Sequence, residues 1–194
     1  MKILQYNSPV ILTFTIVSFI ALIAATVTDG AANWYLFSIY RSSFSDPLFY
    51  LRLFTHVLGH ASFEHYFNNF LTILLIGPML EERYGSKTLL KLITITAFCT
   101  GILHVVLFDS ALLGASGIVF FLILLASYAN FERGRIPITL ILVISIFLGR
   151  EIMGAFIFND NIARMTHVFG GVIGAISGYY YNNKRKSYKG SKRL

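Results

Sequence analysis

The stretch Gly114-Ala115-Ser116-Gly117 opens an apolar run from Ile118 to Leu125, and the rest of the chain is organised around it. A serine at the start of such a run is often inert, because its hydroxyl bonds back to a carbonyl of its own helix. A serine between glycines at the mouth of a membrane helix has a second interpretation. It can be a nucleophile whose backbone neighbours must approach a substrate closely.

The composition of the 194 residues is that of a polytopic membrane protein. Hydrophobic residues make up 56% of the chain and charged residues only 13%, whereas a soluble domain carries about 25% charged residues. The mean hydropathy is +0.68. The formal net charge of +7 suggests a nucleic-acid partner. However, much of the excess lies in a tail at 184–193 that follows an apolar stretch, which favours a cytoplasmic anchor facing lipid.

Cysteine and histidine spacing argues against a metal site. Cys99 is the only cysteine, which excludes an intramolecular disulfide and a cysteine-based zinc site and favours a role as small core filler. His56, His60 and His65 have a spacing that resembles a ligand set, but no carboxylate or cysteine is well placed to complete it. We therefore expect no metal and no cofactor, and we expect His56 and His60 to shape an outer loop.

Six apolar stretches predict a single all-α domain, a bundle of six transmembrane helices over residues 1–194. At about 1.5 Å per residue, the first stretch is long enough to cross a hydrocarbon core of roughly 30 Å. Ala24-Ala25 leaves a cleaved signal peptide open for it, but its length favours a retained span. The predicted spans are 9–28, 63–80, 89–108, 114–130, 136–156 and 162–181, with an aromatic, interfacial outer loop at 29–62 and a basic tail at 182–194.

The positions of the cationic residues predict the orientation. Six spans place both termini on one side of the membrane, and lysine and arginine concentrate on the cytoplasmic side. With the termini inside, twelve of the sixteen cations are cytoplasmic, which predicts a multi-pass protein of the cell (inner) membrane. The inner set is Lys2, Arg83, Lys87, Lys91, Arg133, Arg135, Lys184, Arg185, Lys186, Lys189, Lys192 and Arg193; the outer set is Arg41, Arg52, Arg150 and Arg164.

This orientation brings polar residues of three spans to one depth near the outer face. Ser116 and His167 each lie near the outer start of a span. His65 and Asn69 lie in the first two turns of another span and, being four residues apart, share one helix face. Polar residues inside a membrane cost several kcal/mol unless they are paired. Their convergence therefore indicates a functional site.

Small residues explain how two of these spans can meet. Gly170, Gly174 and Gly178 recur at every fourth position after His167, a pattern that lets membrane helices touch backbones. We expect this stripe to pack His167 against Ser116, with Gly114 and Gly117 contributing from the opposite span.

The chemistry of a Ser–His dyad follows from these residues. His167 can accept the proton of Ser116 Oγ and return it to a leaving amine. The backbone N–H of Ser116, the amide of Asn69 and the ring of His65 can bind an oxyanion. Phe120, one turn after Ser116, can stack on the imidazole.

These motifs resemble those of the rhomboid intramembrane serine proteases over nearly the whole chain. Residues 114–117 fit Gly-x-Ser-Gly, and 167–174 fit His-x-x-Gly-x-x-x-Gly. Residues 65–69 fit His-x-x-x-Asn with Asn69, not Asn68, in register, and 81–85 fit Glu-x-Arg-x-Gly. The chain departs from the family in having Leu51-Arg52 for Trp-Arg and Phe120 for a tyrosine.

The resemblance implies a serine endopeptidase that cuts transmembrane segments of other proteins near the outer membrane face. Arg52, Glu81 and Arg83 carry over as supporting residues. A second interpretation is a catalytically inactive rhomboid-like protein that binds membrane clients and steers their trafficking or degradation, but inactive members lose the serine or the histidine. A small transporter predicts polar residues at mid-bilayer and a repeat between halves, and the sequence shows neither.

Overall fold

The computed structural model describes residues 6–128, 138, 141–146, 149 and 161–191, with side chains at 165–181 in the last segment. Over these residues the chain is helical, as the sequence predicts. The helices are α1 (Pro9–Val27), α2 (Ala31–Leu36), α3 (Pro47–Thr55), α4 (Phe63–Tyr84), α5 (Ser86–Leu107), α6 (Ser116–Ser127) and α8 (Asn161–Ser191).

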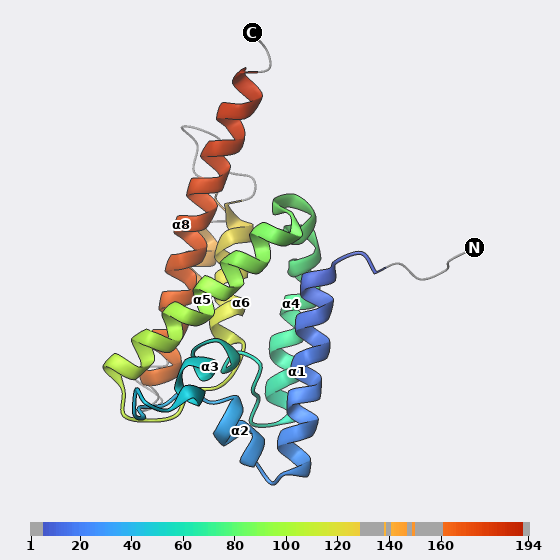
Figure 1. Ribbon diagram of the computed structural model, residues 1–194. Helices are drawn as coiled ribbons and strands as arrows, with labels where there is room; N and C mark the ends of the chain where they lie inside the picture. The colour runs from blue at the N-terminus through green and yellow to red at the C-terminus, as the bar shows by residue number, and fades with distance from the viewer. Residues whose placement is uncertain (1–5, 129–137, 139–140, 147–148, 150–160, 192–194) are drawn as a thin grey trace, which may run out of the picture.

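Helix α6 lies at the centre of the arrangement. Figure 1 shows it between α8 on one side and α4 on the other, with α1 beyond α4 and α5 crossing the bundle. The most extensive contact between two helices is that of α6 with α8. The short helices α2 and α3 lie together at one end, and the C-terminal part of α8 extends beyond the other (Figure 1). The helix that begins with Ser116 therefore packs against α4, α5 and α8.

Side-chain burial follows the pattern of a membrane bundle. Apolar residues fill the space between α1, α4, α5 and α6, among them Phe70, Ile73 and Phe121, which are at most 2% exposed. Large apolar side chains also cover the outside of the helices; Leu75 is 72% exposed and Ile176 64%. An exposed apolar surface of this extent is suited to lipid. Two of the described helices, α1 and α5, are long and apolar enough to cross a bilayer, and α6 is a shorter apolar helix.

The helix bounds differ from the predicted spans in several places. Helix α4 continues to Tyr84 rather than ending at 80, and α5 begins at Ser86, so one residue, Gly85 with φ of 84°, joins them. Helix α6 begins at Ser116 because Gly114 has a φ of 124°, outside the helical region. Helix α8 continues through the basic tail to Ser191. Most of the predicted span at 136–156 lies outside the described residues; 141–146 are helical.

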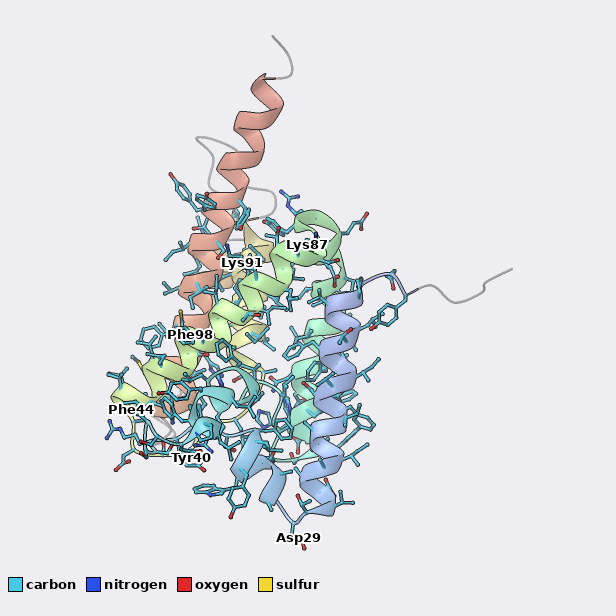
Figure 2. The ribbon with its side chains drawn as sticks, viewed as in Figure 1. Asp29, Tyr40, Phe44, Lys87, Lys91 and Phe98 are labelled. Carbon is cyan, nitrogen blue, oxygen red and sulfur yellow. The ribbon has the colours of Figure 1, made fainter. Side chains whose placement is uncertain are left out.

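The lysines and aromatic residues labelled in Figure 2 lie toward opposite ends of the molecule. Lys87 and Lys91 lie near one end, and Asp29, Tyr40 and Phe44 lie at the other (Figure 2). Aromatic side chains favour the membrane interface, and lysines favour the cytoplasmic side. We name the end that carries α2 and α3 the outer end, after the orientation that the sequence predicts.

The predicted outer loop is more ordered than an irregular interfacial segment, because it contains α2 and α3. Asp46 caps α3 by accepting the Leu48 N–H at 2.9 Å, and Pro47 occupies the first turn. An isolated antiparallel bridge joins Ile39 to Leu112, with both N–H···O distances at 2.9 Å. The bridge connects the outer loop to the segment that leads into α6.

Candidate active site

Ser116 is the first residue of α6 and is half-buried. Its position at a helix N-terminus leaves its backbone N–H without a partner inside the helix. The preceding turn fits closely against α4, since a Cβ at Gly114 would lie 2.8 Å from Cε1 and 2.9 Å from Nε2 of His65. The N–H of Gly114 donates to the carbonyl oxygen of His56 at 2.9 Å. Glycine is therefore required at 114 both for its backbone conformation and for the approach of the His65 ring.

His167 lies on α8 against the same face of α6 that carries Ser116. Its ring packs on Phe120 with centroids 4.3 Å apart and planes inclined by 35°. Phe120 follows Ser116 by four residues, so the two share one helix face. The expected contact of Phe120 with the imidazole is therefore present, in a tilted rather than a stacked arrangement.

Glycines bring α8 onto α6 at the level of these residues. A Cβ at Gly170 would lie 2.9 Å from the carbonyl carbon of Gly117, and a Cβ at Gly174 would lie 3.0 Å from that of Phe121. At Gly178 it would lie 2.6 Å from Tyr128 Cβ. The two backbones are thus in direct contact along the stripe that the sequence shows. This contact, the α6–α8 seam, sets the height of His167 along α6.

His65 and Asn69 complete the group from α4. Ser62 caps this helix by accepting the N–H of His65 at 3.1 Å, which fixes its first turn. His65 is half-buried beside Gly114 and close enough to His167 for the two imidazoles to interact electrostatically. Asn69 is 7% exposed, whereas Asn68 is exposed. The structure therefore brings together the residues that the sequence singles out on three helices.

Two histidines that the sequence assigns to the outer loop also reach this site. The carbonyl of His56 binds Gly114, and Nε2 of His60 lies 3.2 Å from Nδ2 of Asn69. Both rings are fully buried at the outer end, and this burial lowers the pKa of each to about 4. The signals in the sequence are their regular spacing with His65 and their position just before α4.

The predicted supporting residues hold other parts of the fold. Arg52, 1% exposed, forms an ion pair with Asp46 at 2.7 Å and donates to Ser42 Oγ at 2.9 Å, within the outer loop. The Arg52 guanidinium lowers the pKa of the Asp46 carboxyl. The carboxylate of Glu81 accepts the N–H groups of Val10 and Ile11 at 3.0 Å each and so caps α1.

The structure also places Arg83, the remaining predicted supporting residue, and the buried His104. Arg83 lies over the ring of Tyr84 at 5.8 Å, at the inner end of α4. Nε2–H of His104 donates to the carbonyl of Ser110 at 2.8 Å, on the segment before α6. Within the described part of the chain, no three His, Cys, Asp or Glu side chains are grouped to hold a metal ion.

Comparison with known proteins identifies the family. A family model described as the rhomboid domain matches residues 48–184. The chain belongs to the rhomboid family. The match runs from α3 through α8 and so includes all of the residues grouped around Ser116. Rhomboids are membrane proteins and a family of intramembrane proteases, as the resemblance of the motifs implied. A search of curated proteins returned no match.

Proposed function

We propose that this rhomboid is an active intramembrane serine endopeptidase in which Ser116 is the nucleophile and His167 the general base and acid. One observation carries the proposal: the ring of His167 packs against Phe120, one turn from Ser116 on the same face of α6. The α6–α8 seam supports it, because the glycines allow no side chain to separate the two helices at this level.

The groups around Ser116 suit acyl transfer. Ser116 Oγ attacks the scissile carbonyl carbon while His167 takes the hydroxyl proton, and the carbonyl oxygen becomes an oxyanion. Donors for that oxyanion come from the Ser116 N–H and from the side chains of Asn69 and His65. His167 then protonates the leaving amine, and a water molecule hydrolyses the acyl-enzyme in the reverse sense. The reaction needs no metal or cofactor.

The membrane setting favours transmembrane proteins as substrates. We infer six spans in a bacterial-type inner membrane, with both termini in the cytoplasm. This orientation places Ser116 near the outer face. A peptide bond inside a membrane helix is protected because its amide groups are bonded within the helix. A substrate segment must therefore unwind locally near that face, where water is close, before Ser116 can reach it.

The alternative is an inactive rhomboid that binds membrane clients without cutting them. Retention of both Ser116 and His167, together with a glycine at each closely packed position of the seam, favours the enzyme. A client-binding protein needs no nucleophile at a helix N-terminus.

Cleavage of a single-span model substrate in liposomes tests the proposal. Ser116→Ala and His167→Ala should each abolish cleavage, and Asn69→Ala should cost about 10- to 1000-fold, since other oxyanion donors remain. Ser127→Ala is a matched control, because Ser127 lies on the same helix and its hydroxyl donates back to the carbonyl of Ile123 at 2.9 Å. Undiminished cleavage by Ser116→Ala would show that the dyad is wrongly assigned.

A further inference from the structure

His60 is a buried histidine for which the proposed reaction has no use. It is 0% exposed and lies in the turn between α3 and α4. Its ring is surrounded by the aromatic rings of His65, Tyr66 and Phe70, with centroid distances of 4.9, 5.5 and 5.6 Å. Both nitrogens of an imidazole buried this tightly are expected to form hydrogen bonds.

Hydrogen bonding determines which ring nitrogen of His60 carries the proton. Nδ1 lies 3.1 Å from the carbonyl oxygen of Leu58. A carbonyl can only accept, so Nδ1 is the donor and carries a hydrogen. Burial keeps the ring neutral, with its pKa at about 4. A neutral imidazole carries one N–H, and Nε2 is therefore a hydrogen-bond acceptor.

The acceptor at Nε2 in turn determines how the side chain of Asn69 is oriented. Nε2 lies 3.2 Å from Nδ2 of Asn69, so the amide nitrogen must donate. A side-chain amide can rotate to present either its oxygen or its NH₂ group in one direction. Here the NH₂ group is held toward His60, with one of its two hydrogens engaged. The second hydrogen is available to another acceptor, and the amide oxygen is turned away from the NH₂ side.

The backbone of His60 is held from α2 as well. Nδ2 of Asn33 donates to the carbonyl oxygen of His60 at 2.9 Å. The preceding Gly59 packs on α2, since a Cβ there would lie 2.8 Å from Phe37 Cβ and would clash with the carbonyl oxygen of Phe37. The backbone that carries the imidazole is thus held against α2, in addition to the two hydrogen bonds of the ring itself.

We propose that His60 is a positioning residue for the proteolytic reaction: by accepting one N–H of Asn69, it aims the other at the substrate oxygen that becomes negative in the transition state. The inference rests on the proposed function and deepens it. His60 itself touches neither the substrate nor Ser116. Its effect is to prevent the rotation of the Asn69 amide that would direct a carbonyl oxygen at the oxyanion.

Two substitutions at this position separate the two hydrogen bonds of the ring. The amide of a glutamine reaches the place of Nε2, so His60→Gln retains an acceptor for Asn69 and loses the bond to Leu58. The shorter His60→Asn reaches the place of Nδ1 and retains only the bond to Leu58. We expect His60→Gln to lose at most a few-fold in kcat and His60→Asn to lose about 10- to 100-fold, with little change in KM. If His60 only stabilised the loop through its bond to Leu58, His60→Gln would lose more activity than His60→Asn. That order would overturn the proposal.

Combining each substitution with Asn69→Ala tests whether His60 acts through Asn69. In that background the two variants of His60 should cut at the same rate, because the amide that they align is gone. If His60→Asn costs the same factor with and without Asn69, the proposal is wrong. Thermal midpoints of all five variants, Asn69→Ala included, identify any loss that comes from unfolding.

A spectroscopic measurement on the parent protein is independent of its activity. The ¹⁵N spectrum of the parent protein, with His60 assigned by its absence in His60→Gln, should show a protonated Nδ1 and an unprotonated Nε2 at neutral pH. A protonated Nε2 overturns the proposal even if the enzyme is active. Absence of cleavage by the parent protein instead contradicts the proposed function, and the spectrum still decides how Asn69 is oriented.

Discussion

Helices α6 and α8 pack closely because the glycines at their contact have no side chains, whereas hydrogen bonds join the outer end to the bundle. In the α6–α8 seam, Gly170 and Gly174 place two backbones in contact. At the outer end, Arg52, Arg41 and Asn33 donate to backbone carbonyls of other segments. The contacts of these two glycines involve no titratable side chain. The outer end depends on side-chain hydrogen bonds that substitution can remove and on two buried histidines, His56 and His60, that protonation can change. The two regions should therefore fail under different perturbations.

The largest effect is expected in the α6–α8 seam. Gly170→Leu inserts a side chain where the neighbour is the backbone of Gly117, which cannot rotate away, so the helices must separate. We expect a loss of at least about 4 kcal/mol in stability and no proteolysis. Thermal unfolding in detergent measures the loss in stability. Val172→Ile, which enlarges an exposed side chain of the same helix, is the control and should change little.

Acidification should act on the outer end and spare the seam. His56 and His60 have folded-state pKa values of about 4, below the value of 6.5 in an unfolded chain. The unfolded state therefore binds more protons between these values, and stability is complete above pH 6.5 and falls as the pH decreases toward 4. At pH 5 the loss is about 2 kcal/mol for each ring.

Hydrogen exchange resolved by segment measures this loss. Protection of α2 and α3 should decrease between pH 6.5 and 4, after correction for the intrinsic exchange rate, while that of α6 changes less. Replacing both histidines with glutamine should remove the pH dependence. Equal loss of protection in α6 and in the outer helices would contradict the separation of the two regions.

Arg52→Lys should have a moderate effect that is confined to the outer end. The guanidinium binds Asp46, Ser42 and the carbonyl of Tyr35, and a lysine ammonium cannot reproduce this geometry. We expect a loss of about 2 kcal/mol, because a buried charge loses part of its hydrogen bonding. Thermal unfolding detects the loss, and the rate at which a fluorophosphonate labels Ser116 well below the unfolding temperature should stay within a few-fold of the parent.

Arg41→Ala should give the smallest effect. Arg41 is exposed and donates to the carbonyls of Val105 and Val106 at 2.7 and 2.9 Å, at the C-terminal end of α5. Its loss should cost about 1 kcal/mol, since water can replace part of the bonding at the interface. Faster hydrogen exchange in the last turn of α5 is the expected sign. A destabilisation as large as that of Gly170→Leu would show that the outer end, not the seam, limits stability.

The sequence predicts the seam far better than the outer end. Gly170, Gly174 and Gly178 recur with the period of a helix face, and Ser116 and His167 carry their chemistry in their residue types. The bridge between Ile39 and Leu112 uses backbone groups that nearly every residue possesses, so no sequence pattern predicts it. Helices α2 and α3 were missed for a related reason, because their short amphipathic segments are interrupted by aromatic residues that suit an interfacial loop equally well.

The error at the end of α4 has a similar physical origin. The polar run Glu81-Glu82-Arg83 indicates the end of a membrane span, yet the helix continues to Tyr84. Glu81 is buried there at 3% exposure because its carboxylate binds the first amides of α1. A partner 70 residues away in the sequence cannot be inferred from composition. The role of Glu81 was therefore predicted only as support, without its target.

That contact also imposes an order on biogenesis. The N–H groups of Val10 and Ile11 acquire their final acceptor only when residue 81 has been synthesised and inserted. At a translation rate of about 5–20 residues per second, 70 residues take roughly 4–14 s. During that interval the start of the first span depends on water or lipid headgroups for its amides. The start of α1 therefore acquires its cap only after most of α4 has been synthesised.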